Sequence, residues 1–307
     1  MKVSVVVPVY NGAATIEELA RRLQPVLDAH AEAYELILVN DGSRDDSWPA
    51  IQRVAAAHPW VHGIDLMRNY GQHNALLCGV RAARHEVIVT MDDDLQNPPE
   101  EIPKLLAGLS GGLDVVYGAP DRIQHGILRG WASHVTKWVL QGAMGAATAR
   151  KVSAFRAFAL TMRDGFAGFR GPYVNLDVML TWGANRFGAV TVRHDPRAAG
   201  TSNYTFRKLA RHALNMITGF SILPLRLASV MGFLFTLFGF GVLLYVLGRY
   251  LLSGTTVPGF PFLASLIAIL SGAQLFALGV IGEYLALMHF RVMDRPAYVV
   301  RCSSERK

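Results

Sequence analysis

Short apolar runs alternate with amphipathic stretches from the first residue to about Gly118. Runs of this length predict buried strands, and they cover residues 3–9, 35–40, 61–66, 86–91 and 114–117. Strands that alternate with helical stretches predict an α/β domain with an open, doubly wound and mostly parallel sheet. In such a sheet the ligand binds at the carboxyl ends of the strands.

Amphipathic helices are predicted between these strands. After the first strand, apolar side chains recur at helical spacing, and Thr15 followed by Glu18 predicts a capping box at the helix start. Further helices are predicted over residues 46–57, 73–84 and 98–106, with Asn97 as the N-cap of the last one. Residues 126–200 are less regular, and we expect them to complete a domain that covers residues 1–200.

Two long apolar segments follow. Residues 227–248 and 262–282 carry no charged side chain, and each is long enough to cross a hydrocarbon core of about 30 Å. We predict transmembrane helices over residues 225–252 and 262–288, joined by an external hairpin at 253–261. Residues 201–224 combine apolar with basic side chains and predict an amphipathic juxtamembrane helix, although a solvated basic face on a core helix is an alternative.

The flanking charges orient these segments. Seven Lys or Arg and one acid lie between Arg186 and Arg226, and five Lys or Arg against two acids lie between Arg291 and Lys307, whereas residues 250–261 carry no charge. The positive-inside rule therefore places the domain at 1–200 and a tail at 289–307 in the cytoplasm. Two buried helices of a soluble domain, the alternative, would leave the length and the charge asymmetry unexplained.

The composition favours a membrane protein. Of the 307 residues, 51% are hydrophobic and 17% are charged, against roughly 25% charged residues in soluble domains. The net charge of +7 could by itself indicate nucleic acid, an anionic membrane or a phosphorylated substrate. We expect no nucleic-acid partner, because the basic residues gather beside the apolar segments. Cys78 and Cys302 are far apart and predict neither a disulfide framework nor a zinc site.

Acidic groups follow two of the predicted strands. Residues two apart on an extended chain point the same way, so Asp92 and Asp94 can share one cation while Asp93 points elsewhere. Carboxylate oxygens suit Mg²⁺ or Mn²⁺, although a solvated acidic turn is the alternative. Asp41, in Asn40-Asp41-Gly42-Ser43, could accept hydrogen bonds from a nucleobase or ribose, but this tetrapeptide is also common in turns. The chain has neither a P-loop nor a dinucleotide-binding fingerprint.

Successive motifs of the chain resemble those of the family 2 glycosyltransferases with a GT-A fold, and within them the polyprenyl-phosphate glycosyltransferases. The motifs are Val7-Pro8-Val9-Tyr10-Asn11, Asn40-Asp41-Gly42-Ser43, Arg68-Asn69-Tyr70-Gly71-Gln72-His73 and Asp92-Asp93-Asp94-Leu95-Gln96-Asn97-Pro98-Pro99-Glu100. The likeness resumes at Gly200-Thr201-Ser202-Asn203-Tyr204, Pro224-Leu225-Arg226, Gly282-Glu283-Tyr284 and Arg295-Pro296-Ala297-Tyr298. It therefore covers nearly the whole chain.

The resemblance implies a membrane-bound, inverting glycosyltransferase that depends on Mg²⁺ or Mn²⁺. Its donor would be a UDP- or GDP-linked sugar, and its acceptor would be polyprenyl phosphate, such as undecaprenyl phosphate. The site would face the cytoplasm at the inner membrane of a bacterium, in contact with membrane lipids. Relatives form tetramers, so the resemblance also implies a homo-oligomer.

The resemblance also implies roles for particular residues. Those implied for the nucleotide and donor are Pro8, Tyr10, Asn11, Asp41, Asp92 and Asp93. Asp92, Asp94 and Gln96 are implied as metal ligands, and the catalytic set would comprise Asp92, Asp94, Arg122, Arg129 and Arg156. The acceptor phosphate would be bound by Arg129, Arg197, Ser202 and Tyr204. Guanidinium groups suit phosphate oxygens, although an arginine beside a membrane can instead contact lipid headgroups.

The chain departs from the family pattern at several positions. Gly12 stands where relatives usually have glutamate, Asp93 where they have a small residue, and Asn203 where they have lysine. Residues 152–156 replace a more usual Cys-Gly-Phe-Arg. We expect most of these changes to alter which sugar is accepted. They leave Asp92 and Asp94 intact.

Two alternatives to single-sugar transfer, a processive synthase and an inactive scaffold, would each show a different sequence feature. A processive polysaccharide synthase would need a Q-x-x-R-W motif and usually more membrane helices, and the sequence shows neither. A catalytically inactive membrane scaffold would be favoured by loss of Asp92 or Asp94, and both are present. A lipid phosphate is already anionic near neutral pH, so transfer to it does not require a general base.

Overall fold

The computed structural model describes residues 1–120, 151–170, 174–196, 223–253 and 259–304. The chain divides into two compact units. One comprises Met1–His212 together with Asp294–Lys307, and the other comprises Ala213–Met293. The predicted amphipathic helix at 201–224 and most of the predicted hairpin at 253–261 lie outside the described residues.

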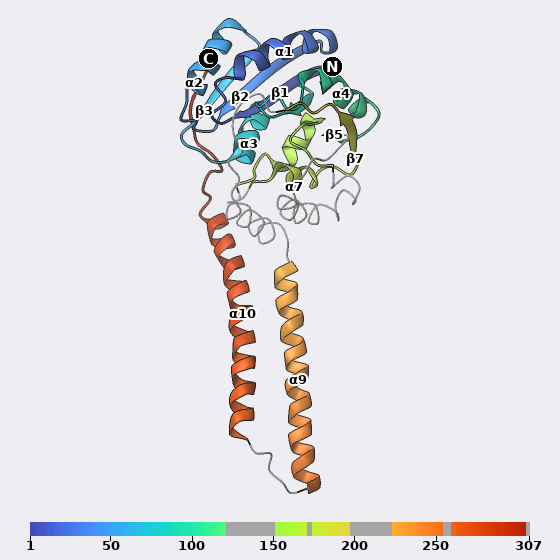
Figure 1. Cartoon of the computed structure of the whole chain (residues 1–307), viewed down its shortest axis with the longest axis vertical. Helices are drawn as coiled ribbons and strands as arrows, with labels where there is room; N and C mark the ends of the chain where they lie inside the picture. The colour runs from blue at the N-terminus through green and yellow to red at the C-terminus, as the bar shows by residue number, and fades with distance from the viewer. Residues whose placement is uncertain (121–150, 171–173, 197–222, 254–258, 305–307) are drawn as a thin grey trace. The chain divides into compact units, whose positions relative to one another are not determined.

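Within the described residues, the first unit contains an eight-stranded sheet in the order β7-β5-β6-β4-β1-β2-β3-β8. Strands β1, β2 and β3 lie side by side in it (Figure 1). The strands are β1 Lys2–Val9, β2 Ala33–Asn40, β3 Val61–Leu66, β4 Val87–Thr90, β5 Val115–Pro120, β6 Arg156–Ala159, β7 Phe187–Val192 and β8 Val300–Ser303. Strands β1 to β4 are parallel, as are β5 and β7, whereas β6 and β8 are antiparallel to their neighbours. The predicted α/β class is confirmed, with a mixed sheet.

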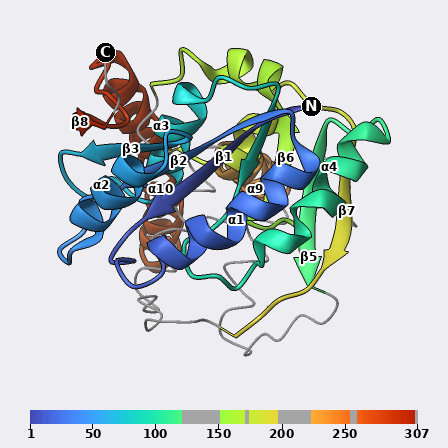
Figure 2. The same ribbon diagram turned by 90° about the horizontal axis from the view of Figure 1, so that it is seen from above.

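Helices cover both faces of this sheet (Figure 2). Helices α1 Ile16–His30, α2 Ser47–Ala57 and α4 Ile102–Ser110 lie on one face, whereas α3 Gln72–Ala82 and α7 Leu176–Leu180 lie on the other. Two short 3-10 helices, η1 Pro99–Glu101 and η2 Leu160–Phe166, lie in the connections.

The apolar runs form strands because both faces of the sheet are buried. Val3, Val5, Val7 and Val9 of β1 belong to one core cluster with the apolar faces of α1 and α2. The opposite face of β1 meets α3, where a Cβ added to Gly79 would lie 2.4 Å from a methyl group of Val6. A strand buried on both faces reads as a continuous apolar run rather than an alternating one.

Helix α1 begins after Thr15 as predicted, but the side-chain caps predicted for α1 and for the helix at 98–106 do not form. Thr15 precedes α1, but its hydroxyl donates to the carbonyl of Gly12 at 3.0 Å instead of capping the helix. Glu18 is engaged by Arg21, so no capping box forms. After β4, η1 precedes α4, and Asn97 is buried with its Oδ1 3.4 Å from Nδ1 of His194 rather than capping α4. Local contacts occupy the side chains of Thr15 and Glu18, whereas a contact from a segment remote in sequence occupies Asn97.

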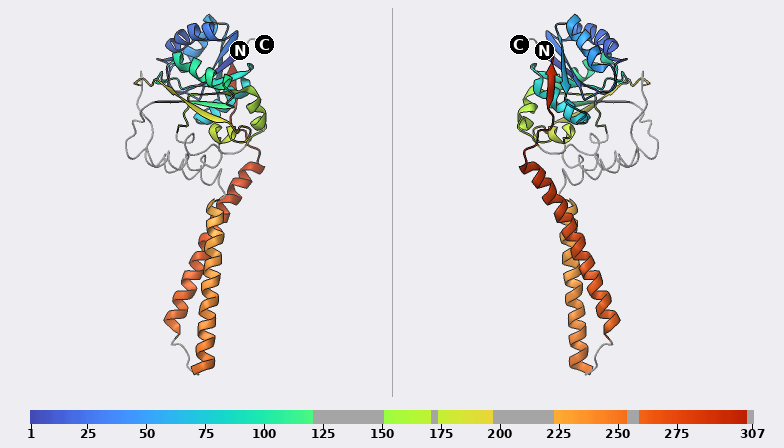
Figure 3. Two further views of the ribbon diagram at one scale, coloured as in Figure 1. Left: turned by 90° about the vertical axis from the view of Figure 1, so that its right-hand side faces the viewer. Right: turned by 90° about the vertical axis from the view of Figure 1, so that its left-hand side faces the viewer.

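The second unit contains two long helices, α9 Leu223–Ser253 and α10 Phe260–Val292. They contact each other and lie side by side (Figure 3). The stretches Pro224–Arg249 and Ile269–Val292 are long and apolar enough to cross a membrane, with mean hydropathies of 2.3 and 1.5 and no burial within the protein. A helix that is apolar on all sides and uncovered by protein suits a lipid environment.

After α10 the chain returns to the first unit. Strand β8 adds to the edge of the sheet beside β3 (Figure 2), where the N–H of Met67 donates to the carbonyl of Val299 at 2.9 Å. Ser304 exchanges two hydrogen bonds with Gly63, and the Arg301 guanidinium donates to the carbonyl of Met67. Residues 289–307 were expected to be only a tail, so this strand is an addition that the sequence did not predict.

We predict that β8 stabilises the first unit. Ending the chain after Pro296 should lower its free energy of unfolding by roughly 2–4 kcal/mol, because each lost hydrogen bond contributes about 0.5–1.5 kcal/mol. Thermal unfolding in detergent measures the change. A chain ending after Ser304 is the matched control, and equal unfolding temperatures for both truncations would contradict the prediction.

Candidate active site

The candidate site lies at the carboxyl ends of β1 to β4. Parallel pairing places Val9 beside Asn40 and Asn40 beside Asp65, and β4 pairs with β1 through Val6 and Thr90. The loops that follow these four strands therefore begin at one edge of the sheet. They carry the motifs identified in the sequence.

The loops after β1 and β2 are tied together. The N–H of Asn11 donates to Oγ of Ser43, and Oδ1 of Asn11 accepts from the N–H of Arg44, both at 2.9 Å. Asn11 adopts a left-handed backbone with φ of 55°, which asparagine tolerates better than most residues. Pro8 is buried within β1, whereas Tyr10, the first residue after this strand, is 40% exposed. Part of Tyr10 is thus accessible to a ligand.

Asp41 connects the loops after β2 and β3. Its carboxylate accepts hydrogen bonds from the backbone N–H groups of Tyr70 at 2.7 Å and Gly71 at 2.8 Å. Burial raises the pKa of Asp41 to about 6, although both N–H donors act in the opposite direction. Gly42 has φ of +63°, and a Cβ there would lie 2.4 Å from the backbone of Arg68. Asp41 and Gly42 therefore fix the backbone around the site.

The acidic loop follows β4, which ends at Thr90. Asp92 accepts a hydrogen bond from the side-chain amide of Gln72 at 2.6 Å, and Asp94 accepts one from the N–H of Gln96 at 3.1 Å. The carbonyl of Gln96 in turn accepts from the N–H of Asp195 at 2.8 Å. Gln72 and Asp195 were not predicted as site residues. Gln72 could have been identified from its position, because it begins the helix that follows β3.

Asp93 points toward the loop after β1. Burial and the charges of Asp92 and Asp94 raise the pKa of Asp93 to about 7, while the N–H of Tyr10 donates to its carboxylate and acts in the opposite direction. Its Oδ2 atom is buried and has no hydrogen-bond partner within the described part of the chain. The three aspartates are therefore close enough to repel one another, which favours a cation beside them.

The donor set fits a hard divalent cation. Asp92 and Asp94 offer carboxylate oxygens and Gln96 offers an amide oxygen, the ligand types that Mg²⁺ and Mn²⁺ take. Among the described residues, no group of three or more His, Cys, Asp or Glu could hold a metal ion. An ion bound here would therefore complete its shell with water and substrate phosphates, as Mg²⁺ commonly does.

Arg156, implied by the family resemblance as a catalytic residue, is buried in the fold and paired with a carboxylate. It is 1% exposed on β6, where its guanidinium pairs with Asp177 and donates to Oγ1 of Thr90 at 3.0 Å. Asp177 also accepts from the Tyr117 hydroxyl at 3.1 Å. In this structure the guanidinium is thus engaged by protein groups. Its contact with Thr90 instead supports the end of β4, from which the acidic loop departs.

The other predicted arginine positions and the acceptor residues cannot be placed in the site. Arg122, Arg129, Arg197, Ser202 and Tyr204 all lie outside the described residues. In the described loop after β7, the N–H of Asp195 donates to the carbonyl of Gln96 at 2.8 Å.

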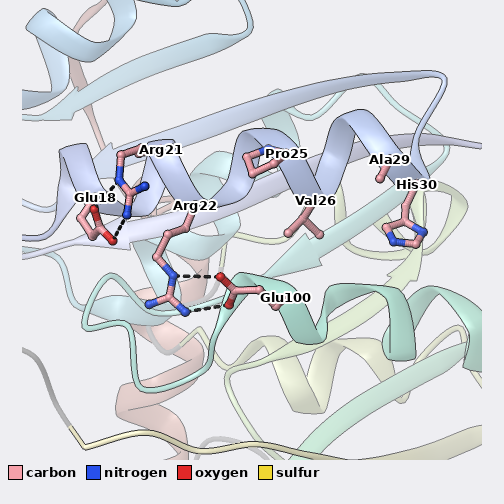
Figure 4. Close-up of a pocket in the computed structure, with 8 residues that line it drawn as sticks. All are labelled: Glu18, Arg21, Arg22, Pro25, Val26, Ala29, His30 and Glu100. Carbon is pink, nitrogen blue, oxygen red and sulfur yellow. Dashed lines mark hydrogen bonds and ion pairs between the residues drawn. The ribbon is translucent and has the colours of Figure 1, made fainter.

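A surface groove along α1 is separate from the predicted site residues (Figure 4). Its charged side chains are already paired, Arg21 with Glu18 and Arg22 with Glu100. Arg22 thereby ties α1 to η1, which follows the acidic loop. The groove contains none of the groups predicted to bind a substrate.

Sequence comparison identifies the family. The chain belongs to glycosyl transferase family 2, whose sequence profile matches residues 4–168. Family membership and named transferase relatives establish that the protein is a glycosyltransferase.

Relatives match along nearly the whole chain. An undecaprenyl-phosphate 4-deoxy-4-formamido-L-arabinose transferase of Pseudomonas savastanoi pv. phaseolicola is 35% identical over 99% of this chain and 92% of its own length. A protein of the same name from Sodalis glossinidius is 34% identical over 98% of this chain and 93% of its own length.

Solved structures support the fold. Glucosyl-3-phosphoglycerate synthase from Mycobacterium tuberculosis, in complex with phosphoglyceric acid, has a TM-score of 0.52 and 20% identity over 71% of this chain and 78% of its own. The same enzyme with Mn²⁺ and UDP-glucose has a TM-score of 0.51 and 18% identity over 71% of this chain and 77% of its own.

We predict that Arg156 stabilises the folded protein through its ion pair with Asp177. Arg156→Met should lower the free energy of unfolding by about 3–5 kcal/mol, because it leaves the Asp177 carboxylate buried without its partner. Arg156→Met combined with Asp177→Leu should be less destabilised than Arg156→Met alone. Chemical denaturation measures both. A single variant with wild-type stability and no activity would instead show that Arg156 contacts a substrate.

The raised pKa of Asp41 predicts a pH dependence of stability. A carboxyl whose pKa is higher in the folded state favours folding when protonated, so its contribution is lost as pH rises from about 4 to about 6. With chelator present, Asp41→Asn should therefore gain stability relative to wild type over this range, by at most about 3 kcal/mol. Thermal unfolding at several pH values measures the difference. A difference that is constant with pH would contradict the prediction.

Proposed function

We propose that this protein transfers a single sugar from a UDP- or GDP-linked donor to polyprenyl phosphate at the cytoplasmic face of the inner membrane. The observation that carries the proposal is the acidic loop Asp92–Asp94, placed beside the exposed Tyr10 at the carboxyl edge of the sheet. The same chain holds two helices apolar enough to cross a membrane. The names of its relatives support undecaprenyl phosphate as the acceptor.

The donor nucleotide would lie against the loops after β1 and β2. The exposed Tyr10 ring offers a face for stacking a nucleobase. Pro8 and Asn11 shape the floor and the turn of this loop, and Asp41 holds the neighbouring backbone through Tyr70 and Gly71. Because its carboxylate is occupied by those N–H groups, Asp41 acts chiefly by positioning the pocket.

The donor diphosphate would lie next to the acidic loop. Asp92, Asp94 and Gln96 would hold Mg²⁺ or Mn²⁺, and a bound ion neutralises negative charge on a diphosphate leaving group. Gln72 orients Asp92 through their hydrogen bond of 2.6 Å. The backbone N–H of Gln96 holds Asp94 in the same manner.

The reaction is a single displacement. An oxygen of the acceptor phosphate forms a bond to the anomeric carbon while the bond from that carbon to the nucleoside diphosphate breaks, so the configuration inverts. The acceptor oxygen is already anionic, and the protein's contribution is alignment and electrostatic stabilisation. Arg122, Arg129 and Arg197, with Ser202 and Tyr204, are proposed to hold the phosphate groups.

The membrane arrangement follows from the same chemistry. Helices α9 and α10 would anchor the protein where the polyprenyl tail stays in lipid, and a basic segment at 201–224 would lie on the anionic membrane surface. Domain 1–200 and residues 289–307 would be cytoplasmic. We also propose a homo-oligomer, a tetramer by its resemblance to the family.

We predict that Asp94→Asn lowers transfer of labelled sugar to undecaprenyl phosphate by about 100-fold or more, because it removes charge at the leaving group. The assay uses UDP- and GDP-sugars in detergent with Mn²⁺ or Mg²⁺. Asp164→Asn is the matched control, since that side chain is 76% exposed.

Other outcomes of this assay favour other functions. Products that carry many sugars would indicate a processive synthase. Nucleotide binding without any lipid product would indicate another acceptor. A folded protein that binds no nucleotide would indicate an inactive scaffold.

A further inference from the structure

The Asp93 carboxylate fills the space that a side chain at position 12 would need. A Cβ added to Gly12 would lie 2.1 Å from Oδ2 and 3.0 Å from Cγ of Asp93. Non-bonded carbon and oxygen atoms do not approach so closely, since van der Waals contact begins above 3 Å. The Asp93 carboxylate can therefore hold its position only while residue 12 has no side chain.

The loop at Gly12 is held from the other side. Its N–H donates to Oγ of Ser47 at 2.9 Å, and its carbonyl accepts from both the N–H and the hydroxyl of Thr15 at 3.0 Å. Ser47 is in turn bonded to Asp45. Because the backbone of Gly12 is fixed by these contacts, a larger side chain there would displace Asp93 rather than the loop.

Asp93 has a specific partner in this loop. Its carboxylate accepts a hydrogen bond from the backbone N–H of Tyr10 and so joins the loop after β1 to the acidic loop after β4. Tyr10 is the residue whose exposed ring faces the proposed nucleotide position. Displacing Asp93 would leave that N–H without its acceptor and release Tyr10 from the acidic loop.

We propose that Gly12 and Asp93 form an interlocked pair that positions Tyr10 for donor binding. Asp93 is a positioning residue, because it acts through Tyr10 and leaves metal binding to Asp92 and Asp94. Gly12 is required only to make room for it. This inference rests on the proposed function, since it assumes that a nucleotide binds at Tyr10.

A double-mutant cycle in the full-length protein tests the pair. The dissociation constant of UDP or GDP, whichever binds wild type, is measured by calorimetry with Mn²⁺ and without lipid acceptor. We expect Gly12→Ala and Asp93→Ala each to weaken binding about tenfold, and the double variant also to weaken it about tenfold. The effects do not add, because both substitutions remove the same contact.

Two substitutions serve as matched controls. Gly165→Ala places its Cβ where nothing lies within 4 Å, and Asp164→Ala removes an exposed carboxylate. Both should bind nucleotide as wild type does. Unfolding temperatures close to that of wild type show that a change in affinity is not caused by loss of the fold.

The outcomes separate this inference from the proposed function. A double variant weakened about 100-fold, or Asp93→Ala with wild-type affinity, would overturn the pairing while wild-type nucleotide binding upheld a donor site. Wild type that binds neither nucleotide would refute the proposed function itself. If Gly12→Ala does not fold, a folded double variant supports the pair and an unfolded one overturns it.

Discussion

The parallel pairing of β1 with β2 on one side and β4 on the other is the constraint on which the site depends. It places the ends of these strands at one edge, so that residues far apart in sequence begin their loops side by side. The apolar residues of β1 are buried on both faces, and this fixes the register. A slip of one residue would move each side chain to the opposite face. The packing of the core therefore sets the geometry of the loops.

Polar side chains then hold the loops to one another through backbone groups. Asn11 and Asp41 each bridge two loops, and the aspartates after β4 are bonded to Gln72 and Gln96. Such contacts satisfy backbone donors that would otherwise be costly to bury. They also concentrate carboxylates in one place, as the raised pKa of Asp93 shows. The residues that hold these loops together thus include the ones proposed to bind a cation.

The sequence predicted strands β1 to β5 and helices α1 to α4, because apolar periodicity is a local property. It did not predict β6, β7 and β8, because the apolar pattern around them is irregular. The sequence also did not show that Arg156 pairs with Asp177 of α7, because that contact depends on the tertiary fold. The capping signal at Asn97 failed for the same reason, since His194 contacts its side chain, whereas the Thr15 hydroxyl bonds locally to the carbonyl of Gly12.

Strand β8 belongs to the first unit although it follows the second unit in sequence. The helices of the second unit are an insertion, because residues Asp294–Lys307 belong to the first unit again. The returning chain pairs with β3, and Met67, which accepts Arg301, directly precedes the loop whose N–H groups bind Asp41. A segment that follows a candidate membrane helix is therefore part of the sheet that carries the site.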